Sequence, residues 1–236
     1  MKVIAVASQK GGSGKTTLAG HLAVQAEAAG AGPVALVDTD PQGSLSEWWN
    51  EREAETPLFA RTTIDKLQED IRRMSQMGIK LLIIDTPPAI TETIANVIRL
   101  SDLLIIPTRP SPHDLRAVGA TVELAEGLST PLVFVVNGAT PRAKITGEAA
   151  IALSQHGTLA PSILHQRVDF AASMIDGRTV MELNASSRSA DEIVKLWDYI
   201  QTRIDRPTRG WHTNNERPAQ KPRQNYGYTP RESAQA

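Results

Sequence analysis

A glycine-rich segment near the N-terminus constrains the fold of this chain more than any other feature. Residues 8–17 read SQKGGSGKTT and follow a short apolar run at residues 3–7, which is suited to a buried parallel strand. Residues 16–29, after the segment, have the pattern of an amphipathic helix. A glycine-rich turn between a strand and a helix points backbone N–H groups at an anion, and the helix N-terminus adds positive potential. The segment therefore predicts a phosphate-binding loop.

The loop departs from the common phosphate-binding pattern at its first position. That pattern requires glycine where this chain has Gln9, and Lys10 stands in front of the glycines instead. Within the loop, Lys15 can reach the β- and γ-phosphates of a nucleotide, and the Thr16 hydroxyl can ligate Mg²⁺. The predicted nucleotide contacts are Gly11, Gly12, Ser13, Gly14, Lys15, Thr16 and Thr17.

This Lys-Gly-Gly-x-Gly-Lys-Thr arrangement resembles the deviant Walker A box of the ParA/MinD family of ATPases. Because the sequence starts at the strand before the loop, we expect it to lack the N-terminal helix-turn-helix domain of longer plasmid ParA proteins, and it is most similar to the small, ParF-like class. The resemblance covers about residues 1–204. It implies a Mg²⁺-dependent ATPase that forms a homodimer on ATP, in which Lys10 crosses the interface to the partner's nucleotide. Lys10, Lys15 and Asp40 are then the predicted catalytic residues.

Acidic residues follow two further apolar runs. Residues 33–37 lead into Asp38 and Asp40, and residues 81–84 lead into Asp85. Ligands of open α/β sheets lie at the carboxyl ends of the strands. The family resemblance implies that Asp40 orients the attacking water and that Asp38 supports the Mg²⁺ shell and its loop. It also implies that Asp85 holds Mg²⁺ through a water, so both Asp38 and Asp85 are predicted metal residues beside the loop threonine.

Asn137 follows the apolar run at residues 132–136 and matches the position where many relatives recognise adenine, which makes it a further predicted nucleotide contact. A turn asparagine is the equally weighted alternative. Residues 166–180 resemble the late loop and helix that border the nucleotide and the dimer seam in small ParA proteins. Trp48 and Trp49, on a predicted helix, are interpreted as packing residues in preference to an interface anchor.

Apolar strand-like runs alternate with helical patterns along the chain. The runs lie at residues 3–7, 33–37, 81–84, 103–106 and 132–136, with a weaker one near 159–164. Helices are predicted at residues 111–126, with Ser111 as the cap, and at 188–204. This alternation predicts an α/β fold with a doubly wound, mostly parallel β-sheet flanked by helices.

The domain boundary is predicted at the end of the last helix. Residues 1–204 are expected to form the P-loop ATPase domain. Residues 205–236 contain four prolines, an excess of basic over acidic residues and no Ile, Leu, Val or Met. Such a composition predicts a disordered, weakly basic tail.

Composition excludes several other classes of protein. The 236 residues include no cysteine, so disulfides and thiolate metal sites are excluded, and the five histidines show no metal-ligand spacing. No apolar run approaches the ~20 residues that span a bilayer, and the chain enters a strand at once, so we expect a cytoplasmic protein without a signal peptide. The net charge of −1 gives no global attraction to nucleic acid, so any DNA contact must come from a local patch.

The resemblance implies a ParA-type positioning ATPase that is associated with the nucleoid. Its ATP dimer is expected to bind DNA without sequence preference, and an adaptor protein is expected to stimulate hydrolysis and so release it. The cargo is left open among a plasmid, a chromosome and a protein body such as a carboxysome or a chemoreceptor cluster. The candidate DNA contacts, each with a solvated surface residue as the alternative, are Arg167, Arg178, Arg188, Lys195 and Arg203.

Three other functions of such a loop are weighed against this one. A MinD-like membrane switch ends in a basic amphipathic helix, which a tail with four prolines and no aliphatic residues cannot form. A relative of nitrogenase iron protein needs cysteines at the dimer seam, and the chain has none. A small-molecule kinase would leave Lys10 without an obvious use.

Overall fold

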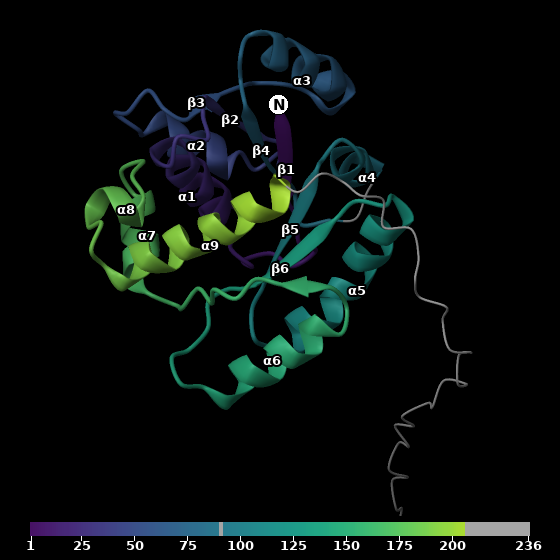
Figure 1. Ribbon diagram of the computed structural model, residues 1–236, viewed down its shortest axis with the longest axis vertical. Coiled ribbons are helices and arrows are strands. Elements are labelled where there is room, and N and C mark those ends of the chain that lie inside the picture. The colour runs from purple at the N-terminus through teal and green to yellow at the C-terminus, as the bar shows by residue number, and fades with distance from the viewer. Residues whose placement is uncertain (90–91, 206–236) are drawn as a thin grey trace, which may run out of the picture.

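The described residues form one parallel β-sheet of seven strands. Figure 1 shows the computed structural model, which describes residues 1–89 and 92–205. The strands are β1 (Lys2–Val6), β2 (Val34–Asp38), β3 (Leu58–Phe59), β4 (Leu81–Asp85), β5 (Leu103–Thr108), β6 (Leu132–Val136) and β7 (Thr158–Leu159). They lie in the order β3-β2-β4-β1-β5-β6-β7, and every neighbouring pair is parallel. The predicted doubly wound α/β fold is confirmed.

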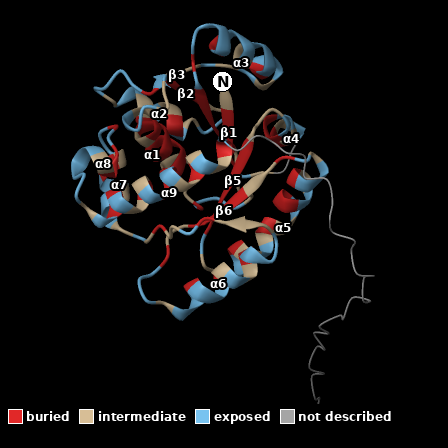
Figure 2. Cartoon of the chain, in the orientation of Figure 1, coloured by how far each residue is buried: buried red, intermediate tan, exposed pale blue. Residues whose placement is uncertain are grey.

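Helices cover both faces of the sheet, and their outer sides are exposed (Figures 1 and 2). They are α1 (Lys15–Ala28), α2 (Ser44–Asn50), α3 (Leu67–Gln76), α4 (Glu92–Arg99), α5 (Pro112–Gly127), α6 (Lys144–Ser154), α7 (Val168–Met174), α8 (Val180–Leu183) and α9 (Arg188–Ile204). A 3₁₀ turn at Ile64–Lys66 precedes α3. One core cluster packs α1, α2 and α9 on one face, and a second packs α3 to α6 on the other. The five longer strands, β1, β2, β4, β5 and β6, contribute to both clusters because successive side chains point to opposite faces.

The predicted helix boundaries agree closely with the structure where capping residues mark them. Helix α9 spans the predicted residues 188–204. Helix α5 begins at Pro112, and the Ser111 Oγ accepts the backbone N–H of Asp114 at 3.2 Å, as a capping serine should.

Two details of the sheet differ from the prediction. The weak run near 159–164 is a strand only at Thr158–Leu159, and Pro161 follows with no N–H to donate to a ladder. Strand β3, with two residues, is too short for any periodic pattern to reveal.

The strand register aligns the ends of the central strands. Val6 and Asp38 both pair with Asp85, so β1, β2 and β4 finish level with one another. On the other side of β1, Thr108 of β5 pairs with Val136 of β6. All the loops that follow these strands therefore emerge at one edge of the sheet, which is where an open α/β sheet binds its ligand.

Helix α9 belongs to the core of the domain. Its buried face includes Ile193, Leu196, Trp197 and Ile200, which pack in the same cluster as α1. The predicted tail lies outside the described residues apart from Asp205, which follows the helix. Among residues 1–89 and 92–205, no helix is both long enough and apolar enough to cross a membrane.

A buried histidine joins α1 to α7 and α8. His21 is completely buried, its Nδ1 donates to the Thr17 carbonyl at 2.7 Å, and its Nε2 accepts the Val180 N–H at 3.2 Å. The ring packs against Phe170, with 5.3 Å between centroids. Burial lowers the pKa of His21 to about 4, while Glu182 raises it and Arg52 lowers it by smaller amounts. The imidazole is therefore neutral at pH 7 and acts as an acceptor for the first turn of α8.

We expect this histidine to make folding stability depend on pH. The folded state depresses the pKa of His21 from 6.5 to about 4, so its full contribution is present above pH 6.5 and is lost as the pH falls toward about 4. The loss is on the order of 3 kcal/mol, because each pKa unit corresponds to about 1.4 kcal/mol. Urea unfolding between about pH 7.5 and pH 4 measures it.

The same titration in two variants isolates the residue. His21→Asn removes the titrating group and should flatten the pH dependence of the free energy of unfolding. His156→Asn changes an exposed histidine and should leave the wild-type slope. An unchanged slope in His21→Asn would contradict the prediction.

Candidate functional site

The loop between β1 and α1 has the backbone that its glycines allow. Gly12 has φ 74° and Gly14 has φ 91°, both in the left-handed region that other residues avoid. Ser13, between them, is completely buried, and its Oγ has no hydrogen-bond partner among the described residues. A buried polar atom without a partner is costly, and at a loop of this kind a bound anion or its water supplies the missing bond.

Asn137, which directly follows β6, holds this loop through a hydrogen bond. Its Nδ2 donates to the Ser13 carbonyl at 2.6 Å, and a Cβ atom on Gly14 would lie 2.2 Å from the same nitrogen. The backbone N–H of Asn137 in turn donates to the Thr108 carbonyl at 2.9 Å. The side chain therefore supports the phosphate loop, and its predicted contact with adenine stays a prediction.

Asp85 and Thr16 form the part of the site that suits Mg²⁺. Asp85 is 1 % exposed, and its Oδ2 accepts the Thr16 hydroxyl at 2.6 Å while its Oδ1 accepts the Thr86 N–H at 3.0 Å. Burial raises the pKa of Asp85 to about 7, against the opposing effects of Thr16 and Lys15. A hydroxyl and a carboxylate are oxygen donors of the kind Mg²⁺ prefers, and Mg²⁺ takes its remaining ligands from water and phosphate.

The described residues contain no cluster of three or more His, Cys, Asp or Glu side chains that could hold a metal by themselves. Mg²⁺ at a nucleotide site takes one or two ligands from the protein and the rest from phosphate and water. The donor set of Asp85 and Thr16 fits such an ion.

Lys15 is the buried cation of the loop. It is only 7 % exposed. Burial lowers its pKa, and the neighbouring carboxylates of Asp85 and Asp40 raise it. An ammonium group in this position is compensated by two carboxylates and remains available to phosphate oxygens.

Asp38 and Asp40 have different surroundings. The Asp38 carboxylate accepts three backbone N–H groups, from Asp40 at 2.9 Å and from Leu45 and Ser46 at 3.0 Å each, so it anchors the loop and the first turn of α2. Burial raises the pKa of Asp38, and these hydrogen bonds lower it. The Asp40 carboxylate accepts the Gln42 N–H at 3.0 Å and faces the cleft described next. The geometry therefore favours Asp40 for contact with a ligand and Asp38 for support.

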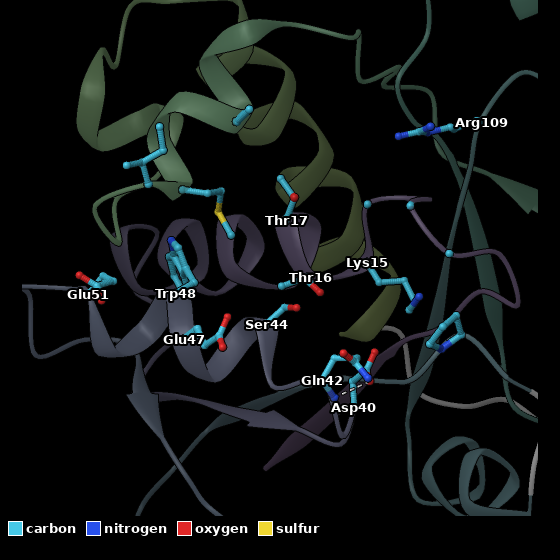
Figure 3. Close-up of a pocket in the computed structure, with 17 residues that line it drawn as sticks. Lys15, Thr16, Thr17, Asp40, Gln42, Ser44, Glu47, Trp48, Glu51 and Arg109 are labelled. Atoms are coloured by element: carbon cyan, nitrogen blue, oxygen red, sulfur yellow. Dashed lines mark hydrogen bonds between the residues drawn. The ribbon is translucent and has the colours of Figure 1, made fainter.

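A cleft of about 980 Å³ opens beside the loop, between α2 and α7 (Figure 3). Its volume is at the upper end of the range for small-molecule sites. The residues that line it are Gly11, Gly12, Gly14, Lys15, Thr16, Thr17, Asp40, Gln42, Ser44, Glu47, Trp48, Glu51, Pro88, Arg109, Ala171, Met174 and Ile175. Seven of the predicted site residues are therefore in this cleft, and Ser13, Asp38, Asp85 and Asn137 are placed behind its wall.

Lys10 lies apart from the other predicted catalytic residues. It is exposed, and it does not line the cleft of its own chain. By contrast, the sequence analysis missed Arg109 and the walls formed by α2 and α7. The only signal for Arg109 was its position directly after an apolar strand.

Both tryptophans pack within the chain, as interpreted from the sequence. Trp48 is 4 % exposed, and its Nε1 donates to the Arg178 carbonyl at 3.1 Å. Its ring lies against Gly20, where a Cβ would come within 3.1 Å of it. The Trp49 Nε1 donates to the Pro57 carbonyl at 2.8 Å. Trp48 thereby joins α1, α2 and the segment before α8.

Most of the candidate DNA contacts interact with neighbours in the same chain. Three of these pairs are salt bridges, namely Arg167–Glu192 at 2.6 Å, Arg178–Asp176 at 2.5 Å and Lys195–Asp191 at 2.7 Å. Arg203 donates to the Tyr199 hydroxyl and to Thr158, and Arg188 is exposed. The exposed pairs of Arg178 and Lys195 are weak enough for a phosphate to replace the carboxylate, whereas the Arg167–Glu192 pair is largely buried. DNA contact by these residues stays a prediction.

Comparisons with known proteins agree with this geometry. A family model described as the CobQ/CobB/MinD/ParA nucleotide binding domain matches residues 4–180. The maintenance of carboxysome distribution protein A of Halothiobacillus neapolitanus is 31 % identical over 209 residues, which cover 84 % of this chain and 95 % of that protein.

Two solved structures share the fold at identities below 25 %. An ATP complex of an aspartate-to-alanine variant of Cyanothece McdA aligns with a TM-score of 0.67 at 19 % identity, covering 86 % of this chain and 96 % of the other. The MinC:MinD cell division protein complex of Aquifex aeolicus aligns with a TM-score of 0.70 at 16 % identity, with the same coverage.

We expect Gly14→Ala to abolish tight nucleotide binding without unfolding the domain. The new methyl group would require the left-handed backbone of Gly14 and would clash with Asn137, so the loop must move. Affinity for a fluorescent ATP analogue should fall by ~10-fold or more, because displaced loop amides no longer face the phosphates. Gly119→Ala in α5 is the control, since open space surrounds that glycine. Equal affinity in Gly14→Ala and wild type would count against the loop geometry.

Proposed function

Because the chain belongs to the CobQ/CobB/MinD/ParA family of nucleotide-binding domains, we propose that it is a Mg²⁺-dependent ParA-type ATPase that positions a cargo. The observation that carries this proposal is the convergence of Lys15, Thr16, Asp85 and Asp40 at one sheet edge, around a loop with left-handed glycines. Phosphoryl transfer depends on positioning and charge neutralisation, and this arrangement offers both.

The proposed roles follow from the contacts of each side chain. The loop amides and Lys15 hold the phosphates, and Thr16 with Asp85 holds Mg²⁺, which neutralises charge on the β- and γ-phosphate oxygens when bound. Asp40 orients the attacking water, because its carboxylate faces the cleft with one oxygen fixed by the Gln42 N–H. Asp38 keeps that loop in place through three backbone hydrogen bonds.

We propose that ATP joins two copies of the chain. Lys10 is exposed at the start of the loop and outside the cleft of its own chain, so it is free to reach the nucleotide of a facing copy. A cation supplied in trans to phosphoryl transfer is worth ~10³–10⁵ in rate in related enzymes. Hydrolysis removes the charge that Lys10 binds, so the dimer separates afterwards.

The dimer is proposed to bind DNA without sequence preference and to be released by an adaptor protein that stimulates hydrolysis. The printed name of the Halothiobacillus relative favours a large protein body as the cargo, because that protein maintains carboxysome distribution and aligns over nearly its full length. Partition of a plasmid or chromosome is the second candidate, which the ParA members named in the family description support. Such a protein works in the cytoplasm, on the nucleoid.

A MinD-like membrane switch is the less favoured alternative. The last described helix, α9, packs its apolar face into the core, so this helix is not available to insert into lipid. The Aquifex MinD complex shares the fold with this chain but at 16 % identity, which carries no argument for a membrane role.

We expect Asp40→Ala to bind ATP and to remain dimeric. Without an oriented water, hydrolysis should fall ~100-fold or more, so the ATP-bound dimer accumulates. Light scattering during size exclusion, with ATP and Mg²⁺, measures the mass.

Lys10→Ala should bind ATP as a monomer, and Lys15→Ala should bind no ATP. Lys144→Ala, at an exposed surface pair, is the control. A monomeric Asp40→Ala with bound ATP would refute the dimer mechanism.

DNA retention should require ATP and should fall steeply with salt. Non-specific binding releases counterions from phosphates, so affinity for plain duplex should drop by orders of magnitude between about 50 and 200 mM salt. Filter binding of Asp40→Ala with ATP, compared with the same variant with ADP, measures this. Salt-insensitive or nucleotide-independent retention would favour a different partner surface.

A further inference from the structure

Arg109 is a cation of the cleft with its own contact to the phosphate loop. It directly follows β5 and is exposed. Its stem lies over Gly138, where a Cβ atom would be 3.7 Å from Arg109 Cγ and 3.6 Å from Nε. Its Nη2 lies 4.0 Å from the Cβ position of Gly12. Figure 3 shows the side chain extending toward the cleft from the wall opposite Asp40. The guanidinium therefore lies beside the Gly12 turn of the loop.

Two glycines flank the Arg109 side chain. Gly12 and Gly138 have φ of 74° and 64°, and a Cβ atom built at either would lie at ordinary van der Waals distance from Arg109. Within residues 1–89 and 92–205, Arg109 forms no ion pair, whereas Arg52 and Arg178 each bind a carboxylate. A guanidinium beside an anion-binding loop and without a carboxylate of its own is free to bind phosphate.

The acidic lining of the cleft indicates that binding a triphosphate there requires further positive charge. Three acidic residues line it, namely Asp40, Glu47 and Glu51, against the cations of Lys15 and Arg109. The Lys15 charge is partly offset by neighbouring carboxylates. A triphosphate adds further negative charge, so binding it in this cleft requires positive groups in addition to Lys15 and Mg²⁺.

We infer that Arg109 binds the terminal phosphate of ATP held by the loop of its own chain, which rests on the proposed ATPase function. The helix end of the loop points its backbone N–H groups at the phosphate chain, and the Lys15 side chain extends from there to the β- and γ-phosphates. Gly12 lies nearer the strand end, so a guanidinium above it faces the outer phosphate. Two parallel N–H groups of an arginine match two phosphate oxygens. Because ADP lacks the terminal phosphate, this contact distinguishes ATP from ADP.

The test compares two nucleotides in a background that isolates one chain. Arg109→Gln and Arg109→Lys are each made in the full chain carrying Lys10→Ala, so that contacts across a dimer do not contribute. Calorimetry with a slowly hydrolysed ATP analogue and with ADP gives both affinities. Arg109→Gln should weaken the ATP analogue about 10-fold or more and ADP less than about 2-fold, the size expected for a lost charge-assisted contact. Arg109→Lys should recover part of the loss.

Matched variants separate the possible failures. Arg116→Gln removes the same charge from an exposed position of α5 outside the cleft and should leave both affinities unchanged. Equal losses for the ATP analogue and ADP, or no loss for either, overturn the contact with the terminal phosphate. So does a loss that appears only when Lys10 is restored, since it would place the contact on a facing copy. Normal nucleotide affinity in Lys15→Ala would instead overturn the proposed function itself.

Discussion

The buried carboxylate of Asp85 is the interaction on which the rest of the site depends. Burial of this group, which is 1 % exposed, disfavours its ionised form, and the hydrogen bond from Thr16 and the charge of Lys15 favour that form. The same residue connects the strands, because its carbonyl accepts the Thr39 hydroxyl at 2.7 Å and the neighbouring Thr86 hydroxyl donates to Val6 at 3.0 Å. The ends of β1, β2 and β4 are thus tied to the atoms that would receive Mg²⁺, and the rigidity of the sheet extends into the phosphate loop.

A second set of contacts joins helices α1 and α2, which follow the loops of the site, to the region from Gly177 to Glu182 around the start of α8. The Arg52 side chain is 2 % exposed, donates to the Gly177 carbonyl at 2.5 Å, pairs with both Glu182 oxygens and lies over the Trp48 ring. His21, from α1, binds the same segment on its other side. Helix α2, which follows the Asp40 loop, and helix α1, which follows the phosphate loop, therefore share one neighbour. Because α7 also lines the cleft, a change at the terminal phosphate that moves α2 must also move α7 or break these contacts.

Sequence reasoning reached the parts of the site that are local. The phosphate loop, Asp40 and Asp85 each follow a strand whose apolar pattern is visible in a few residues, and the cap at Ser111 is set by its immediate neighbours. What it missed depends on contacts between distant residues. The support of the loop by Asn137 spans 124 positions, and nothing in the sequence around either residue specifies that bond. The place of Arg109 over the loop depends in the same way on β5 lying beside β1, which only the sheet order reveals.

The surface charges explain why DNA retention would need two copies of the chain. The net charge is −1, and three of the five candidate basic residues already lie against carboxylates, so these five residues offer few free cations to DNA from a single copy. Non-specific affinity changes exponentially with the number of phosphates neutralised, because each contact releases counterions. A dimer that contacts DNA with both subunits therefore has a much larger association constant than a monomer, provided that both subunits can reach the duplex at once. On this argument the proposed DNA-binding surface, with few free cations per subunit, would suit a switch, since a monomer would leave DNA readily and only an ATP-bound dimer would be retained.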